Sequence, residues 1–597
     1  LFPYTTLFRS GLTMAFRLKV TKVKGREYAA IVENIYSKQR HGSSSRTIRS
    51  CGDLIKLRLE NPNIDEELKQ EVARLNADAK AASQAWINRH LQSVDCTQDR
   101  ALKQVNYGIA FYRRIWESLK LHTWFDRAKR NARGRIGYDL DQAVFLLAAM
   151  RILKPMSKSK TFGSRDELLF DFNKLSLDDI YHSLDVLADK KKTILSNLNR
   201  NLEEIYARVK TIAFYDVTTF YFESFDSDEL RARGMSKENK TNEVQVVLGL
   251  LVDGEGIPID YELFRGNTSE MNTIVEVVNN YKAKNKLEKV TVVADRGLNS
   301  RLNLKTLTDL NFDYIVAQSI DRLPAETKEK IFREDNWDQE FVAQDGSETF
   351  KVKTIKQSSA PELDNEIIVT WSAKRQAHDL KVLNERFDKC KQLLDRGTGA
   401  VDASIKHGVR QFLRIKKGAK VAYATNDDLY QKRKKQAGYY ALVTSHKHTD
   451  AMQIYRDLRR LWHIEECFRV MKTNLDTRPV YVWTPKRIRG HFLVCYLALV
   501  MERLAYYRIR QVGLDLSSQK VIELLAQAKM TILEQDKTKK TLYLKQGISA
   551  NAAKNNEYAN AVDELMRVAG IEPLASIEDS IGLVRKLKVS SNMKLVL

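Results

Sequence analysis

Thr-Ile-Ala-Phe-Tyr-Asp-Val-Thr-Thr-Phe-Tyr-Phe, residues 211–222, is the stretch at which the pattern of the chain changes. Before it, apolar residues over 61–208 recur at steps of three and four, which is typical of helices. After it come further short runs rich in β-branched and aromatic residues, at 244–252, 258–264, 289–294 and 314–317. The region that begins at 209 is therefore predicted to be built around a sheet.

Turns and helices divide these runs in a definite order. Asp253-Gly-Glu-Gly256 joins the second run to the third and is a strong hairpin signal. Helical patterns at 269–284 and 300–310 come before and after the fourth run. Three strands, a helix, a strand, a helix and a strand predict an α/β core of the ribonuclease-H-like type, although other α/β folds share much of this order.

The chain is strongly basic, with 99 Lys and Arg against 76 Asp and Glu and a formal charge of +23. Such an excess favours a polyanionic partner, because each neutralised phosphate releases condensed counterions. Charge alone leaves a ribosome-associated or membrane-surface protein as the alternative. The five cysteines are scattered without a C-x-x-C pair, which favours a reducing cytoplasm. The longest apolar run, 492–501, is too short to span a bilayer, so no membrane partner is expected.

Two aspartates stand out in the sheet region. Asp216 lies within an apolar β run, where a charge is costly unless it is paired or bound to metal. Asp295 ends the run Val-Thr-Val-Val-Ala and precedes Arg296, and open α/β sheets place their sites at such strand ends. The structural alternatives are an Asp216 that faces solvent and an Asp295 that caps a helix.

A third carboxylate, Glu465, lies on an amphipathic, basic helix. One stripe of this helix is apolar and carries Leu461, Ile464, Phe468 and Met471. The adjacent stripe joins the carboxylate to an aromatic ring and two cations, as Trp462, Glu465, Arg469 and Lys472. This face suits a metal ligand flanked by groups that hold DNA phosphate. A face of surface salt bridges is the alternative, and Glu466 points about 100° away from Glu465.

Three such carboxylates predict metal-assisted phosphoryl transfer. Attack on a phosphodiester needs a deprotonated nucleophile and a stabilised leaving oxygen, and two divalent ions about 4 Å apart supply both. Mg²⁺, for which Mn²⁺ can substitute, prefers hard oxygen ligands. The carboxylates must stand on rigid elements, because a misplacement of about 1 Å costs about two orders of magnitude in rate.

At these residues the chain resembles the DDE transposases of bacterial insertion sequences, in the superfamily marked by a Tyr-Arg-Glu-Lys helix signature. Most of the chain from Met14 takes part in the resemblance, in several blocks in the right order. The densest blocks are Tyr215-Asp-Val-Thr-Thr, Gly256-Ile-Pro, Phe264-Arg-Gly-Asn-Thr-Ser-Glu270, Ala294-Asp-Arg-Gly, and the helix from Leu461 to Lys472. The resemblance implies a ribonuclease-H-like catalytic core, a β insertion before the Glu, two Mg²⁺ ions, and catalysis on transposon ends by a homodimer.

Carried over residue by residue, the resemblance makes Asp216, Asp295 and Glu465 the catalytic, metal-binding triad. Lys472 matches the signature lysine that contacts DNA near the cleaved end. Leu461 and Leu458 stand where the signature has Arg and Tyr, so nearby residues out of register become the candidates for those contacts. The expected DNA-binding residues are Lys472, Arg469, Trp462, Arg459, Arg460, Tyr455 and Arg296.

The expected organisation has seven parts. Residues 1–13 resemble translated sequencing-adaptor sequence, and Met14 is the expected natural start. The other parts are an N-terminal β-hairpin region at 14–60, a helical DNA-end-binding domain at 61–208, the core at 209–320 and 451–534, a mostly β insertion at 321–450, and a C-terminal appendage at 535–597, expected to be helical.

The function expected from these features is cut-and-paste transposition. The partners would be double-stranded DNA, both the terminal inverted repeats of an insertion sequence and the target, in the cytoplasm at the nucleoid. Basic clusters at 416–417, 432–435 and 486–489 would hold the DNA backbone. The alternatives are another ribonuclease-H-like nuclease or recombinase, and a non-catalytic DNA-binding protein derived from a transposase.

Overall fold

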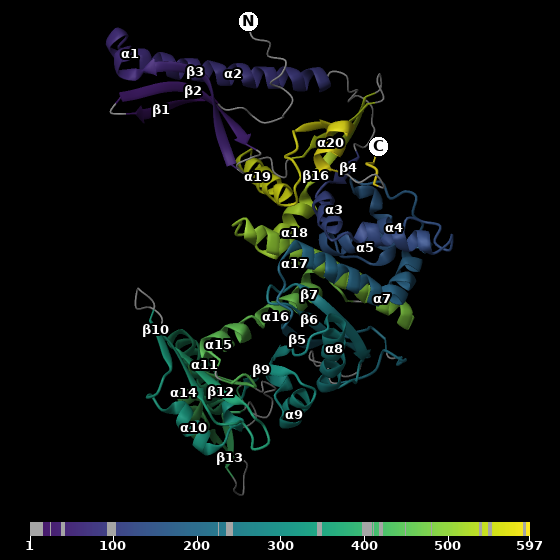
Figure 1. Cartoon of the computed structure of the whole chain (residues 1–597), viewed down its shortest axis with the longest axis vertical. Coiled ribbons are helices and arrows are strands. Elements are labelled where there is room, and N and C mark those ends of the chain that lie inside the picture. The colour runs from purple at the N-terminus through teal and green to yellow at the C-terminus, as the bar shows by residue number, and fades with distance from the viewer. Residues whose placement is uncertain are drawn as a thin grey trace.

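The computed structural model forms an elongated molecule whose parts follow one another along its length (Figure 1). The expected leader at 1–13 and Lys417 of one basic cluster lie outside the residues that the structure describes. The described residues are 16–23, 26–37, 42–91, 103–224, 226–234, 243–342, 349–396, 409, 411–416, 422–447, 449–478, 480–535, 540–546, 552–588 and 593–596.

The N-terminal part is a three-stranded antiparallel sheet covered by helix. Its strands are β1 (Phe16–Val23), β2 (Arg26–Ser37) and β3 (Gly42–Asp53), so a third strand extends the hairpin expected in this region. Two helices follow, α1 (Leu54–Glu60) and α2 (Ile64–Leu91). Asn76 of α2 exchanges two hydrogen bonds with the backbone of Phe16, which fixes the helix along the sheet.

The next part is helical, and a helix from much later in the chain completes its core. In chain order the elements are α3 (Ile109–Ser118), α4 (Leu121–Asn131), α5 (Leu140–Leu153), α6 (Lys158–Gly163), the short 3-10 helix η2 (Arg165–Glu167) and α7 (Leu177–Ile205). Every residue of α5 is buried, because α17 (Pro485–Gln511) packs against both α5 and α7. The buried carboxylate of Asp141 is satisfied by Arg113 at 2.7 Å and by the Trp116 indole at 2.7 Å.

The centre of the molecule is a nine-stranded mixed sheet in the order β10-β11-β12-β15-β9-β8-β5-β6-β7. The central strands are β5 (Ile212–Tyr221), β6 (Gln245–Val252), β7 (Pro258–Arg265), β8 (Thr291–Ala294) and β9 (Asp313–Gln318). β8 pairs parallel with both β5 and β9. β6 lies between β5 and β7 and pairs antiparallel with both. The chain thus has a mixed α/β fold, as the sequence predicts.

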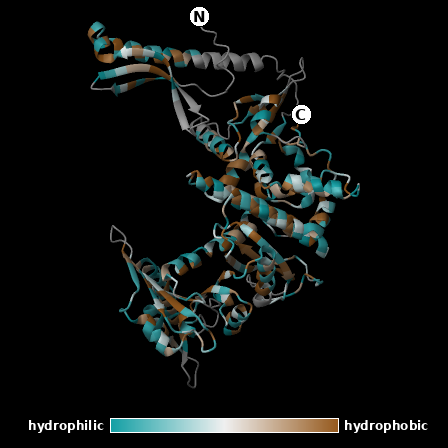
Figure 2. Cartoon of the chain, viewed as in Figure 1, coloured by the Kyte–Doolittle hydropathy of each residue, from teal (hydrophilic) through white to brown (hydrophobic). Residues whose placement is uncertain are grey.

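Helices cover both faces of this sheet. On one face lie α8 (Glu270–Asn285) and α9 (Arg301–Asp309), whose Ile274, Leu304 and Leu307 share a core with alternate residues of the strands. On the other face lie α17 and the helices that carry the candidate glutamate. Figure 2 shows the hydrophobic residues concentrated in the sheet and in the helices around α17.

The insertion extends the central sheet. The added strands are β10 (Gln339–Val342), β11 (Thr349–Ile355), β12 (Glu366–Ser372) and β15 (Tyr439–Thr444), and β15 pairs antiparallel with β9. The insertion is a mixture of helix and strand, with η4 (Ile320–Arg322), α10 (Ala325–Phe332), α11 (Ala373–Asp395), the hairpin β13 (Leu413–Lys416) and β14 (Ala422–Thr425), and α14 (Asp427–Gln436).

The C-terminal residues form a second, smaller sheet. Its elements are α18 (Ser518–Gln527), β16 (Lys529–Gln535), β17 (Lys540–Lys545), α19 (Ala552–Val568), β18 (Ile577–Asp579) and α20 (Ser580–Leu587). The sheet order is β18-β17-β16-β4, so β4 (Gln104–Asn106) ties the appendage to the start of the helical part. The appendage is therefore α/β rather than helical. Of the helices in the described ranges, none is long and apolar enough to cross a membrane.

Candidate active site

Asp216 lies in the middle of β5, level with the carboxyl end of the parallel strand β8, which Asp295 follows directly. β5 and β8 pair with Phe214 opposite Val293, and two further residues along both chains place Asp216 opposite Asp295. The backbone of Asp295 is still extended, with φ −76° and ψ 173°, before the 3-10 helix η3 (Arg296–Leu298) begins. Neighbouring strands are about 4.8 Å apart, and every second residue points to the same face. Both aspartates therefore share the face of Phe214 and Val293.

The helix that carries the glutamate packs on this same face. α15 (Ala451–Arg459) and α16 (Trp462–Arg469) are followed by a π-helical turn, η5 (Val470–Asn474). α16 contacts β5 and β6, and its buried Ile464 and Phe468 belong to the core that includes Phe214 and Val293. Glu465 itself is exposed at the side of this contact. The helix that carries Glu465 thus packs on the face of the sheet that the two aspartates share.

A glycine permits this approach of the helix. Gly256, in the turn between β6 and β7, has a φ of +76°, and a Cβ there would lie 2.9 Å from Nδ1 of His463. The thiol of Cys467 donates to the carbonyl of Gly256 at 3.4 Å, so the helix rests directly on the turn. Burial, with Arg503, Arg460 and Arg510 nearby, lowers the pKa of His463 to about 4, so its ring is neutral at pH 7.

The donor chemistry of the three residues fits a hard divalent ion, which prefers carboxylate oxygens. The Asp216 carboxylate accepts a hydrogen bond from the Val217 backbone at 2.7 Å. Across the described part of the chain, no three His, Cys, Asp or Glu side chains are gathered into a group that could hold a metal ion. Asp216, Asp295 and Glu465 are therefore not gathered closely enough here to form such a group, and their role as a triad stays a prediction.

The two cations expected on the same stripe as Glu465 take different positions. Arg469 pairs with Glu466, donating from Nε at 2.8 Å and from Nη2 at 2.5 Å, and this contact lowers the pKa of Glu466 despite its partial burial. Lys472 lies in the π-helical turn, and its ammonium is 5.9 Å from the ring centre of Phe220. Phe220 is on β5, on the same face as Asp216. Lys472 therefore lies on the face of the sheet that carries Asp216, whereas Arg469 is held by Glu466.

The remaining candidates on these helices are partly engaged. Tyr455 stacks on Phe350 of the insertion, with 4.8 Å between ring centres, and Arg459 lies 5.9 Å from the Tyr455 ring. Arg460 is 3.7 Å from Asp457. Trp462 is 45% exposed, with its ring beside that of His463. Trp462 thus presents an exposed aromatic surface beside these cations.

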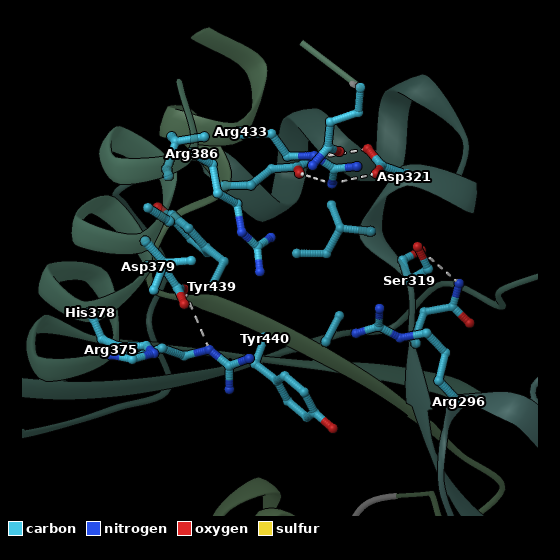
Figure 3. Close-up of a pocket in the computed structure, with 18 of the residues that line it drawn as sticks. Arg296, Ser319, Asp321, Arg375, His378, Asp379, Arg386, Arg433, Tyr439 and Tyr440 are labelled. Carbon is cyan, nitrogen blue, oxygen red and sulfur yellow. Dashed lines mark hydrogen bonds and ion pairs between the residues drawn. The ribbon is translucent and has the colours of Figure 1, made fainter. Parts of the chain in front are cut away.

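A cavity of about 500 Å³ lies next to the candidate site (Figure 3). Arg296, which directly follows Asp295, lines it together with residues of α11, α14, β9 and β15. Tyr440 of β15 also lines it, and burial, with the nearby charge of Asp295, raises the pKa of Tyr440. The sequence gives no signal for this cavity beyond Arg296, because its other walls come from distant parts of the chain.

Two exposed aromatic residues near the site are also absent from the sequence predictions. Tyr481 and Trp483 are 54% and 61% exposed and alternate with the buried Val480 and Val482. Arg478, at the start of this segment, stacks on Tyr221 at the end of β5, with 4.9 Å to the ring centre. The segment therefore lies beside the strand that carries Asp216. Their signal in the sequence is the alternation Val-Tyr-Val-Trp before the proline of α17.

The protein is thus a mixed α/β protein in which two aspartates lie on neighbouring parallel strands, at the carboxyl end of β8 and beside a basic cavity. Residues 208–501 match the family model described as the transposase DDE domain. This part of the chain, which holds all three carboxylates, is therefore a transposase DDE domain, and the resemblance to DDE transposases is confirmed. That family generally uses divalent metal ions.

Two solved structures are similar over parts of the chain. One is the piggyBac transposase synaptic complex with hairpin DNA, at 10% identity and a TM-score of 0.34, covering 71% of this chain and 80% of that one. The other is the Mos1 transposase paired-end complex with the left transposon end, at 13% identity and a TM-score of 0.13, covering 29% and 57%. No curated protein matches this chain significantly.

Proposed function

We propose that the protein is a cut-and-paste transposase that cleaves and joins DNA strands at the ends of a bacterial insertion sequence. The observation that carries the proposal is the placement of Asp216 opposite Asp295, under a helix that bears Glu465, within a transposase DDE domain. The strand order β7-β6-β5-β8-β9, with a meander followed by two parallel strands, supports a ribonuclease-H-like core.

The three carboxylates would hold the metal ions of the reaction, Mg²⁺ or Mn²⁺. Two such ions, when bound, activate the attacking water or 3′-hydroxyl and stabilise the leaving oxygen. The protein's own side chains and strands would position the DNA and the carboxylates. Lys472 and Arg296 flank the strand ends and would contact phosphate, and the strands hold Asp216 and Asp295 at a fixed spacing.

The partners follow from this reaction. Terminal inverted repeats and target DNA would lie against the cationic side chains around the site, in the cytoplasm at the nucleoid. A homodimer would pair the two ends of the element. The chain has 99 basic and 76 acidic residues, and this excess of positive charge supports a polyanionic partner such as DNA.

The test is a nicking assay on plasmid DNA that carries the genomic flanks of the reading frame, with Mg²⁺ or Mn²⁺ added. Asp216→Asn, Asp295→Asn and Glu465→Gln should each abolish strand cleavage while binding to the end DNA survives. Asp309→Asn, an exposed carboxylate on α9, is the matched control and should cleave normally. Normal cleavage by any of the three site variants would contradict the assignment, and binding without cleavage by the wild type would leave a DNA-binding protein.

A further inference from the structure

The cavity beside Asp295 is built by elements that come from both the core and the insertion. β9 and η4 contribute one wall, through Gln318, Ser319 and Asp321. α11 contributes the facing wall with residues at steps of three and four, and α14 and β15 close the remaining sides. Arg296 and Gln318 both line the cavity, and Arg296 directly follows Asp295, so the cavity begins one residue after the candidate metal ligand.

Positive charge exceeds negative charge in this lining. Four arginines line it, and the two carboxylates are each engaged by part of that charge. Asp321 accepts hydrogen bonds from Arg433 and Gln436 at 2.8 Å each, and Lys432 lies 2.8 Å away. Asp379 accepts the Gly438 backbone N–H at 3.1 Å and lies 3.6 Å from Arg375. Arg433 and Arg375 thus contact the two carboxylates, and the other two arginines of the lining do not.

Those two, Arg296 and Arg386, face the cavity from opposite walls (Figure 3). Neither guanidinium pairs with a carboxylate or donates a hydrogen bond within the described ranges. Both side chains are exposed to solvent and stand near other cations, so an anion that entered between them would be attracted by both. The geometry thus points to an anionic ligand between them.

Phosphate is the anion that this arrangement fits best. The planar guanidinium fork matches phosphate oxygens in pairs, and two forks from opposite sides would enclose the group. The hydroxyl of Ser319 at the rim can add a further donor. A volume of about 500 Å³ lies within the range of small-ligand sites and accommodates a nucleotide-sized group.

We propose that this cavity binds a phosphate group of the DNA at the active site, held between Arg296 and Arg386. The inference rests on the proposed function. Two sources share this chemistry: a phosphodiester of a continuous strand, and the terminal 5′-phosphate that hydrolytic cleavage leaves on one side of a nick. The second carries more negative charge at neutral pH, since its second ionisation has a pKa of about 6.

The experiment measures DNA binding without cleavage. All proteins carry Asp216→Asn, and binding is followed by fluorescence anisotropy with three end duplexes: unnicked, nicked with a 5′-phosphate, and nicked with a 5′-hydroxyl. Arg386→Ala and Arg296→Ala should each weaken binding about tenfold and reduce the slope of log affinity against log salt by about one. Lys381→Ala, which removes an exposed charge from α11 outside the cavity, should change neither quantity.

The three duplexes separate the sources. A loss confined to the 5′-phosphate duplex assigns the cavity to a terminal phosphate, and an equal loss on all three assigns it to a continuous strand. Binding of all three duplexes by both arginine variants at the level of the background protein would overturn the inference. If the wild type fails to cleave while the arginine effect persists, only the proposed function fails; if it cleaves and the arginines have no effect, only this inference fails.

Discussion

At the scale of single residues, Gly256 determines how closely the glutamate helix can approach the sheet. Its φ of +76° is strained for any L side chain, and a Cβ would meet His463 at 2.9 Å. Gly256→Ala should therefore lower the free energy of unfolding by about 1–3 kcal/mol and reduce DNA cleavage, because α16 must move. Chemical denaturation and the nicking assay measure the two effects.

Gly513→Ala is the matched control for this change. Gly513 has a φ of +77°, but its Cβ would meet nothing within 4 Å. Gly513→Ala should lower the free energy of unfolding through backbone strain alone and leave DNA cleavage unchanged. Equal cleavage by the two variants would mean that the spacing between α16 and the β6–β7 turn does not matter to the site.

Lys158 is a second residue whose environment has a measurable consequence. Its amine is fully buried and contacts Nδ1 of His491, whose Nε2 lies 3.0 Å from the carbonyl of Thr477. Burial, with Arg151 nearby, lowers the pKa of Lys158 well below its ordinary value. The unfolded chain then binds more protons than the folded chain, so stability rises with pH up to the ordinary lysine pKa of about 10.4.

Lys158→Met removes this titration while keeping a similar volume. Between pH 7 and pH 9 the free energy of unfolding of the wild type should rise relative to that of Lys158→Met. Burial, with Lys158 and Arg151 nearby, lowers the pKa of His491 well below its ordinary value too, but its contribution adds little above pH 7, because the ordinary histidine pKa is about 6.5. A constant difference between the two proteins over this range would show that Lys158 is charged in the folded state.

Residue types alone are enough to propose the three carboxylates, because a charge in an apolar run and a carboxylate at a strand end are local features. Arg386 could not be predicted in this way. It is one of many basic residues on α11, and what distinguishes it is a cavity whose other walls come from β9 and α14.

At the scale of elements, the segment between the π-helical turn and α17 presents Tyr481 and Trp483 to solvent beside β5. Exposed aromatic rings next to cations suit stacking on unpaired bases, worth about 1–3 kcal/mol for each base. Trp483→Ala should weaken binding to end DNA with unpaired bases by about five- to a hundredfold and leave binding to fully paired DNA nearly unchanged. Phe341→Ala, a 43% exposed aromatic of the insertion, is the control. An equal loss on both DNAs would exclude stacking.

Elements with a strong local period follow the sequence prediction, and elements defined by long-range pairing do not. β5 to β9 lie in the predicted runs because their β-branched residues alternate or are buried on both faces. That β15 continues this sheet through β9, and that β4 joins the C-terminal sheet, depends on partners more than a hundred residues away. The π-helical turn also escapes a prediction based on a regular helix, and it changes the direction of Lys472.

At the scale of the whole molecule, α17 connects the catalytic sheet to the helical part. Its 27 residues are buried along most of their length against α5, α7 and β7. The end-binding role expected for 61–208 therefore depends on a helix from the far side of the DDE domain. Residues 103–208 without α17 would expose the apolar faces of α5 and α7 to water.

A fragment of residues 103–208 should accordingly lack a cooperative unfolding transition and expose apolar surface to a hydrophobic dye. Co-expression with residues 480–597, which supply α17 and the strand partner of β4, should restore fixed packing, because burial of a helix of this length contributes many kcal/mol at about 25 cal/mol per Å². Urea denaturation followed by near-ultraviolet circular dichroism distinguishes the two cases. A cooperative transition of the fragment alone would show that the helical part is an independent domain. DNA-end recognition and the catalytic sheet would then be coupled by the bound DNA and not by α17.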